Sequence, residues 1–430
     1  MNRQRHSMFP VVTLIPNRML KPVCFIFFVL LMVQCSTPKE NLSAIESINV
    51  SESFQSKSAV KLSSIVSQLE YIPLETNPEC VLNYPRFYVI DSLILVNDFR
   101  QILVFDRTTG KYMRKIGRYG NGPNEYRNTF LGMTEAVAEE KGLVFVRGNR
   151  PDEALAFSLL DGRFLFNVNY DFTSYLKDES WLQHEYGLRP VNLNDSLYAF
   201  FVKNAIGTTP VKLFLMNNKS QIVKKFSNHQ ICEPSKMVRT INHDYFHRWE
   251  HLYFKETYND TLYEVRPDSL LPRYVFNLGK YSPPYEKKHT MWDEIDKWAS
   301  STDKKVFSYL DYPDHFELWK YMQVIDLIEN DNYLFFRLFH GQHYYACSYH
   351  KREQKLNISD DTNFENDIDD FMPFYPKYIN MKGELVGTLE VPDVLEWFAD
   401  NPEKASALAP HIRQLKNLKE EDNQIVVIAK

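Results

Sequence analysis

The feature that most constrains this chain is a group of four short apolar runs, broken by turn residues, that recurs along most of its length. The clearest copy reads PRFYVIDSLILVNDFRQILVFDRTTGKYMRKIG and starts at Pro85. Each run predicts a β-strand. The four strands are residues 87–90, 93–96, 102–106 and 112–116. Gly110 ends the last turn, where it can adopt the positive φ of a tight hairpin. The copy therefore predicts one four-stranded antiparallel sheet.

Further copies follow at intervals of roughly forty to seventy residues, a spacing typical of repeats that stack or close into a ring. They fall within residues 142–168, 194–226, 250–279, 331–359 and 377–390. The last copy holds only a hairpin, after which residues 392–419 have a helical pattern and the chain ends in one strand, NQIVVIAK. Together these units predict an all-β fold, a six-bladed β-propeller of four-stranded antiparallel blades with a short C-terminal helical segment.

A propeller must close its ring, because an open last blade would expose unpaired backbone groups along one edge. The stretch SQLEYIPLE (Ser67–Glu75) is a spare strand near the N-terminus, and we expect it to complete the last blade. Residues 284–320 depart from the strand pattern, with Met291, Ile295 and Trp298 at helical spacing. We expect a helical insertion there, between the fourth and fifth blades.

The N-terminus has the pattern of a bacterial lipoprotein signal. Residues Val23–Val33, VCFIFFVLLMV, form an apolar run that is typical of a signal peptide and too short to span a bilayer. Cys35 follows at the position of the acylated cysteine of such signals, although Gln34 stands where a small residue is usual. Translation from Met19, in place of Met1, would make the signal more compact.

These features divide the chain into three parts. We expect a signal peptide over residues 1–34, a lipidated N-terminus and tether over 35–61, and the propeller over 62–430. Lipid on Cys35 would attach the protein to a membrane without a spanning helix. We expect the cell envelope, at the outer membrane, as its location; the sequence leaves open which side of that membrane it faces, and its oligomeric state.

The charge balance argues against a nucleic-acid partner. The full sequence has a formal net charge of −5, and residues 1–34 contain four basic side chains and no acid, so the mature chain is more acidic still. No basic excess is left to neutralise phosphates. The remaining cysteines, Cys80, Cys232 and Cys347, are odd in number and widely spaced. We expect buried free thiols instead of a disulfide framework or a zinc site.

With the blades placed, the sequence resembles the six-bladed β-propeller lipoproteins of Gram-negative bacteria, which are similar to NHL-repeat propellers. The resemblance runs from about Leu62 to Lys430. It is carried by the first four-stranded copy, by GNGPNEY (120–126) and by NDIDDFMPFYP (366–376). Members commonly have glycine after the second aspartate of the last motif, where this chain has Asp370. The resemblance implies a fold and an envelope location, and it carries no reaction or catalytic residues with it.

The stretch KIGRYGNGPNEY (115–126) holds three of the 14 glycines of the chain. A phosphate-binding loop would need a Lys-Ser or Lys-Thr pair opening a helix. Neither is present, and Pro123 has no amide hydrogen to offer. We therefore interpret the stretch as a structural crossover between the first two blades, with side chains that could still line the mouth of the propeller.

Two groups of residues could bind a metal ion. His243, His247 and His251 recur every four residues, but the following sequence predicts a hairpin, on which successive histidines would lie too far apart for one ion. The acidic run over 360–370 offers carboxylates to calcium but lacks the spacing of an EF-hand loop. No cofactor is predicted, and calcium remains the alternative. Asp367 and Asp369 open what we expect to be an inner strand, so they should face the central channel.

Two classes of function remain, of which binding is preferred. A binding or scaffolding module would hold a glycan, peptide or protein partner at one propeller face. A metal-dependent propeller enzyme, a lyase or hydrolase, would need polar residues converging on the channel, and no catalytic residue can be named from the sequence. The candidate ligand-binding residues are Arg118, Glu125, Tyr126, Arg127, Trp249, Asp367, Asp369 and Phe374.

Overall fold

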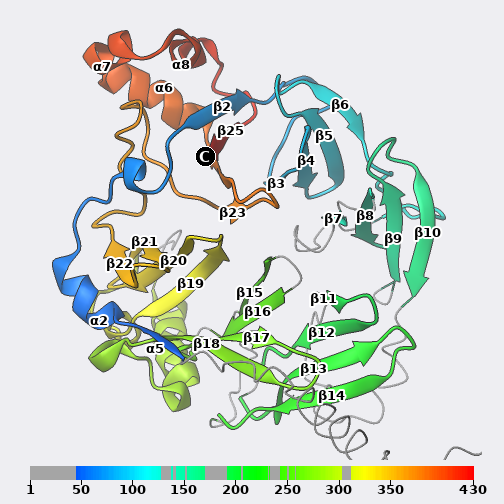
Figure 1. The fold of residues 1–430 in the computed structure, drawn as a ribbon, viewed down its shortest axis with the longest axis vertical. Helices are drawn as coiled ribbons and strands as arrows, with labels where there is room; N and C mark the ends of the chain where they lie inside the picture. The colour runs from blue at the N-terminus through cyan, green and yellow to red at the C-terminus, as the bar shows by residue number, and fades with distance from the viewer. Residues whose placement is uncertain are drawn as a thin grey trace, which may run out of the picture. The chain divides into compact units, whose positions relative to one another are not determined.

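The sequence repeats form six sheets around a common axis in the computed structural model, which confirms the predicted six-bladed β-propeller (Figure 1). The residues that the structure describes are 45–126, 137–138, 142–150, 153–169, 191–204, 207–230, 232, 243–248, 251–256, 258–302 and 311–430. Residues 45–430 form one compact unit. Cys35 and the predicted signal peptide lie outside the described residues.

The six blades are numbered along the chain, each with its first strand nearest the axis (Figure 1). Blade 1 holds β3 (Pro85–Val89), β4 (Leu93–Asp98), β5 (Gln101–Asp106) and β6 (Tyr112–Lys115). Blade 2 holds β7 (Val137–Ala138), β8 (Leu143–Arg147), β9 (Glu153–Ser158) and β10 (Phe164–Asn169). Blade 3 holds β11 (Val191–Asn194), β12 (Leu197–Phe201), β13 (Val211–Asn217) and β14 (Ile222–Ser227).

The second half of the ring follows the same order. Blade 4 holds β15 (His243–Arg248), β16 (His251–Glu256), β17 (Thr261–Val265) and β18 (Leu270–Phe276). Blade 5 holds β19 (Gln323–Glu329), β20 (Tyr333–His340), β21 (His343–His350) and β22 (Lys355–Ile358). Blade 6 holds β23 (Tyr378–Ile379), β24 (Leu385–Leu389), β25 (Ile425–Ala429) and β2 (Leu69–Pro73).

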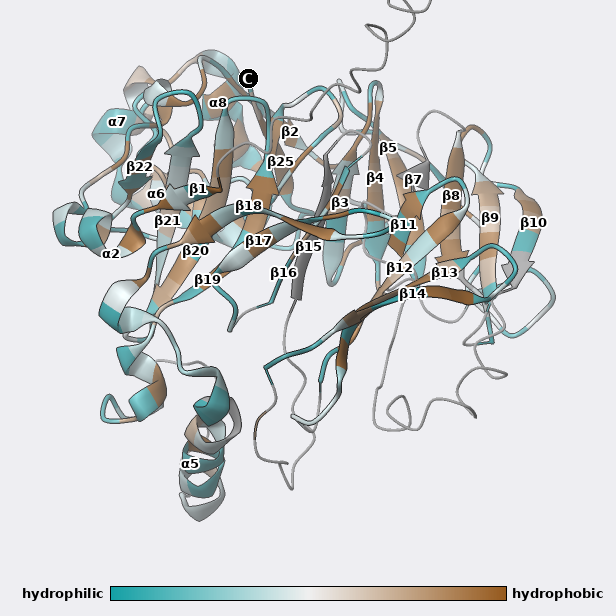
Figure 2. Cartoon of the chain, turned by 60° about the horizontal axis from the view of Figure 1, so that its bottom comes forward, coloured by the Kyte–Doolittle hydropathy of each residue, from teal (hydrophilic) through white to brown (hydrophobic). Residues whose placement is uncertain are grey.

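The hydrophobic core lies between neighbouring blades. Figure 2 shows hydrophobic residues concentrated along the blade strands. Leu95 and Val104 of blade 1 pack in one buried cluster with Val144 and Phe157 of blade 2, and comparable clusters join blades 3 and 4, 4 and 5, 5 and 6, and 6 and 1. Each blade is therefore stabilised mainly by burial of apolar surface against the next.

The ring closes by the predicted route. β2 is the outermost strand of blade 6 and pairs antiparallel with the C-terminal strand β25, from Leu69 opposite Ala429 to Pro73 opposite Ile425. Backbone hydrogen bonds between residues 67–68 and Lys430 extend this pairing. Since β25 would otherwise be an unpaired edge, the spare strand satisfies its backbone groups and ties the two ends of the ring together.

Residues 45–66, here called the strap, differ from the sequence expectation. Residues up to 61 were expected in the tether, but β1 (Glu46–Ile48) pairs parallel with β18 at the outer edge of blade 4. Ile48 and Val50 are buried, and so is Phe54 of the turn that follows α2 (Val50–Ser53). The open edge of β18 accounts for the difference, because it offers backbone partners to a segment with few apolar residues.

The two predicted helical regions are confirmed. α5 (Lys288–Ser301) lies between blades 4 and 5 and projects beyond the blades (Figure 2). Its Met291 and Ile295 are buried in a cluster with Phe316 and Trp319. α6 (Val391–Asp400), α7 (Pro402–Ala407) and α8 (Pro410–Arg413) fill the interval between β24 and β25. Among the described residues, no helix has the length and hydrophobicity to cross a membrane.

Candidate functional site

The glycine-rich stretch 115–126 closes on itself, which confirms its interpretation as a crossover. The amide of Gly120 donates to the carbonyl of Tyr126, and the amide of Gly122 donates to Glu125 Oε2 at 2.7 Å. The Gly122 amide, which a phosphate would need as a donor, is therefore already bonded to a carboxylate. Gly117 has φ +61°, and a Cβ on it would lie 2.6 Å from the ring of Phe157, so glycine is required there for packing as well as for the turn.

Two of the candidates in this region have structural roles in the described chain, and a third is exposed. Tyr126 is buried, donates its hydroxyl to the carbonyl of Ile116 at 2.9 Å, and packs edge-on against Phe157. Burial raises the pKa of Tyr126 to about 12. Glu125 accepts the amide of Gly122 as described above, whereas Arg118 is exposed. Arg127 and Trp249 lie outside the described residues.

Asp367 and Asp369 face the strap and β2, which corrects the expectation that they face the channel. The amide and hydroxyl of Ser63 donate to Asp367 at 2.9 and 2.6 Å. The hydroxyl of Tyr71 in β2 donates to Asp369 at 3.0 Å. The segment 366–376 crosses from blade 5 to blade 6 beside the N-terminal residues, and carboxylates there satisfy the donors of that segment.

The turn after Asp369 forms without the glycine of the related sequences. Asp370 itself adopts φ +60°, a left-handed conformation that aspartate tolerates better than most residues. Further along, Phe374 is buried, and its amide and carbonyl both pair with Phe364. The ring of Phe374 therefore belongs to the core between blades 5 and 6.

The structure gives no support to a metal site in the part of the chain that it describes. No group of three or more His, Cys, Asp and Glu side chains there is close enough to hold one ion. His243, His247 and His251 lie on the predicted hairpin, formed by β15 and β16. Nδ1 of His251 lies 3.4 Å from Glu264. Cys80, Cys232 and Cys347 are buried free thiols, as predicted.

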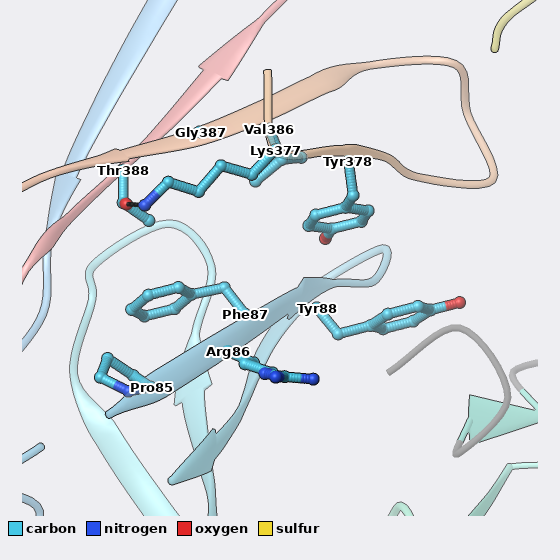
Figure 3. A pocket seen from close by; sticks show the side chains of 9 residues that line it. All are labelled: Pro85, Arg86, Phe87, Tyr88, Lys377, Tyr378, Val386, Gly387 and Thr388. Carbon is cyan, nitrogen blue, oxygen red and sulfur yellow. Dashed lines mark hydrogen bonds between the residues drawn. The ribbon is translucent and has the colours of Figure 1, made fainter. Parts of the chain in front are cut away.

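A pocket of about 270 Å³ lies at the seam between blades 6 and 1, on the strands nearest the axis (Figure 3). Blade 1 contributes β3 and blade 6 contributes the hairpin of β23 and β24. The lining residues are Pro85, Arg86, Phe87, Tyr88, Lys377, Tyr378, Val386, Gly387 and Thr388. Only ring closure brings these two blades together, since Val89 and Tyr378 are 289 residues apart in the sequence.

Tyr378 holds the two sides of this pocket together. Its ring stacks on Tyr88 with 5.7 Å between centroids and 8° between planes, and its hydroxyl accepts the amide of Val89. The ring of Phe87 lies on the opposite side of β3 from the Tyr88 ring and is half-buried (Figure 3). The pocket therefore has an aromatic wall held in place by contacts between blades.

Lys377 supplies the charge on the other wall. Its side chain extends along the pocket and donates to the hydroxyl of Thr388 at 2.5 Å (Figure 3). Lys377 as a whole is exposed, but protein around its amine displaces water and lowers the pKa of Lys377. Arg86, also exposed, adds a second cation. An aromatic surface, two cations and a hydroxyl can hold a ligand with a polar or negative group.

The comparisons with known proteins follow the same boundaries as the compact unit. A family model described as a domain of unknown function, DUF4934, matches residues 45–430. The chain belongs to the DUF4934 family. The match starts with the strap, which supports treating residues 45–61 as part of the DUF4934 ring. None of the curated proteins matches this DUF4934 chain in sequence.

A solved structure from Bacteroides fragilis shows the same fold. A Bacteroides fragilis protein named as exported is 16% identical to the DUF4934 chain, with a TM-score of 0.61, covering 90% of this chain and 99% of that one. A DUF4221 family member from Bacteroides vulgatus is 9% identical with a TM-score of 0.47, covering 85% and 96%. The extracellular domain of a Bacteroides thetaiotaomicron one-component system aligns more loosely, at a TM-score of 0.33 and 10% identity, over 74% and 32%. The first of these proteins is described as exported and the third as an extracellular domain.

Sequence reasoning missed Phe87, Lys377 and Tyr378. Each lies within a repeat that was recognised, but a strand pattern marks a position only as inward or outward facing. Lys377 and Tyr378 directly follow the motif NDIDDFMPFYP, whose resemblance to other propellers pointed to this crossover. That adjacency, combined with closure of the ring, was the available signal for the seam between blades 6 and 1.

Proposed function

We propose that this chain is a lipid-anchored envelope protein that binds one residue of a glycan or peptide in the pocket between blades 6 and 1. The observation that carries the proposal is the pocket itself, with the ring of Phe87 on one wall and the amine of Lys377 on the other. Its volume of about 270 Å³ lies just below the usual range for drug-sized ligands, so it suits a single sugar ring or side chain of a larger ligand.

Arrays of glycans and of peptides test this proposal. Purified protein should bind a defined set of array members, and Phe87→Ala and Lys377→Met should each lose that binding at least tenfold. Met113→Ala is the matched control, because Met113 is exposed on the outermost strand of blade 1. Binding that survives in both pocket variants would contradict the proposal.

The anchor is tested separately. Acylation requires the thiol of Cys35, so Cys35→Ser should abolish incorporation of labelled palmitate and release the protein from the membrane fraction. Continued labelling of Cys35→Ser would contradict lipidation at this residue without affecting the binding proposal.

A further inference from the structure

Arg337 lies on the seam between blades 5 and 6. It lies on β20, with its guanidinium carbon 4.3 Å from the centroid of the Tyr375 ring. Among the described residues, its side chain forms no ion pair or hydrogen bond, and Nε is buried without a partner. Stacking on an aromatic ring therefore holds this guanidinium in place, and its planar fork has no carboxylate partner in the described part of the chain.

Tyr375 contributes a second unused group. The residue is buried beside the guanidinium, and within the described chain its hydroxyl has no hydrogen-bond partner. Buried polar groups are nearly always satisfied by protein or by another molecule. Two unsatisfied donors therefore lie side by side at this seam.

Asp326 completes the cluster from the innermost strand of blade 5. It lies at a bulge in β19 between Ile325 and Ile328 and adopts φ +55°. Its carboxylate has no ion pair with Arg337 within 4.0 Å, although burial raises the pKa of Asp326 and the Arg337 charge opposes that rise. Asp326 is itself exposed to solvent, and bulges with a positive φ at a non-glycine residue are common beside binding sites.

The segment that carries Tyr375 borders the pocket. Tyr375 precedes the pocket residue Lys377 by two positions, and β23 follows directly. The lining residue Gly387 lies against the same segment, because a Cβ on it would be 2.8 Å from the carbonyl oxygen of Tyr375.

We propose that Arg337, stacked on Tyr375, binds the carboxylate of a ligand whose uncharged part occupies the pocket; this inference rests on the proposed function. A planar guanidinium matches a carboxylate with two parallel hydrogen bonds. The Asp326 carboxylate would repel the two charges of a phosphate dianion more strongly than the single charge of a ligand carboxylate. The same chemistry is offered by an acidic sugar or by the C-terminus of a peptide.

Calorimetric titration with four probes tests the inference and separates the two sources. D-Glucuronate is compared with D-glucose, and N-acetylalanine with N-acetylalaninamide. We expect one of the acids to bind at least tenfold more tightly than its neutral partner, and the acid that does so identifies the source. Arg337→Gln should remove that preference and leave binding of the neutral probe unchanged.

Two further variants control for structure. Arg337→Lys keeps the charge but loses the planar fork, so it should lose most of the preference for the acid while folding normally. Arg114→Gln is the matched control, because Arg114 also has a buried, unpartnered Nε but donates another nitrogen to the carbonyl of Leu159 at 2.6 Å. The preference should survive in Arg114→Gln.

The outcomes are distinguishable. If neither acid is preferred over its neutral partner, or if the preference persists in Arg337→Gln, the inference is overturned. Should array binding still depend on Phe87 in that case, the proposed function stands on its own. If no binding of any array member or probe depends on Phe87, both the inference and the proposed function are overturned.

Discussion

Two arginines, Arg107 and Arg337, lie on neighbouring seams of the ring and have opposite surroundings. Arg107 joins blade 1 to blade 6, with Nη2 2.8 Å from Glu384 and 3.9 Å from Glu70. Arg337 joins blade 5 to blade 6 by stacking on Tyr375, without an ion pair among the described residues. The paired arginine is used in closing the ring, and the unpaired one is left available to a ligand.

The pairing of Arg107 also controls the ionisation of its partner. Burial alone would raise the pKa of Glu384, but hydrogen bonds from Arg107 and Asn380 outweigh it and lower the pKa. Lys430, at the C-terminal end of the ring, lies 2.7 Å from Glu70 and 3.5 Å from Glu384. The first and last blades are therefore joined by a network in which each charge has an opposite partner. Among the described residues, Arg337 has no carboxylate within ion-pair distance.

The largest expected effect comes from breaking the ion pairs at the seam between blades 6 and 1. Arg107→Met would leave Glu384, only 12% exposed, with a more distant lysine as its cation. We expect the free energy of unfolding to fall by about 2–3 kcal/mol, measured by urea denaturation. Arg163→Met is the control, because the ion pair of Arg163 is exposed and its loss should cost less than about 1 kcal/mol. Equal losses in the two variants would contradict a role for Arg107 in closure.

The corresponding substitution at the seam between blades 5 and 6 should change the stability much less. Arg337→Met breaks no ion pair with the described residues and removes a buried nitrogen that lacks a partner. We expect the free energy of unfolding to stay within about 1 kcal/mol of the unmodified protein, or to increase. A loss as large as that of Arg107→Met would show that Arg337 stabilises the ring and would end the contrast between the seams.

A pH dependence sharpens the comparison. Burial raises the pKa of Asp326 above its ordinary value of 3.8, so its ionised form opposes folding. That penalty is absent below the ordinary value and grows as the pH rises through the folded-state pKa. Asp326→Asn, which also tolerates a positive φ, should raise the melting temperature at pH 7 and leave it nearly unchanged at pH 3.5. An equal rise at both pH values would exclude an ionisation effect.

The smallest effect concerns the other aspartate with a positive φ. Asp370, at φ +60°, lies in the crossover into blade 6, in place of the glycine of related sequences. Asp370→Gly relieves backbone strain in the folded state but increases the conformational entropy of the unfolded chain. Because the two effects oppose each other, we expect the free energy of unfolding, measured by thermal unfolding, to change by less than about 0.5 kcal/mol. Asp326→Gly should instead alter ligand binding. A large stability change for Asp370→Gly would mean that its carboxylate has a role in the crossover.

The fold could be predicted because its causes are local and repeated. Each blade has its own alternating runs and turn residues, and closure by residues 67–75 follows from the unpaired edge of the last blade. The structure of the strap was not predicted, because the segment has few apolar residues and its strand β1 forms only by pairing with β18. A segment whose structure depends on a distant partner leaves no periodic pattern in its own sequence.

The candidate site could not be predicted for the same reason. The loops that attracted attention, around Tyr126 and Asp369, are rich in polar residues because their own turns and the N-terminal segment need them. The residues of the inferred site look ordinary in sequence: Phe87 is one strand position among many, and nothing marks Arg337 as unpaired. Whether an arginine has a partner is decided by packing between blades, which only the three-dimensional arrangement reveals.

The most direct test of this account is a crystal structure of the protein with the preferred acid bound. The account predicts a carboxylate within hydrogen-bonding distance of the terminal nitrogens of Arg337, with the remainder of the ligand against Phe87 and Lys377. A ligand bound elsewhere on the propeller, with Arg337 still making no contact to it, would contradict the central claim.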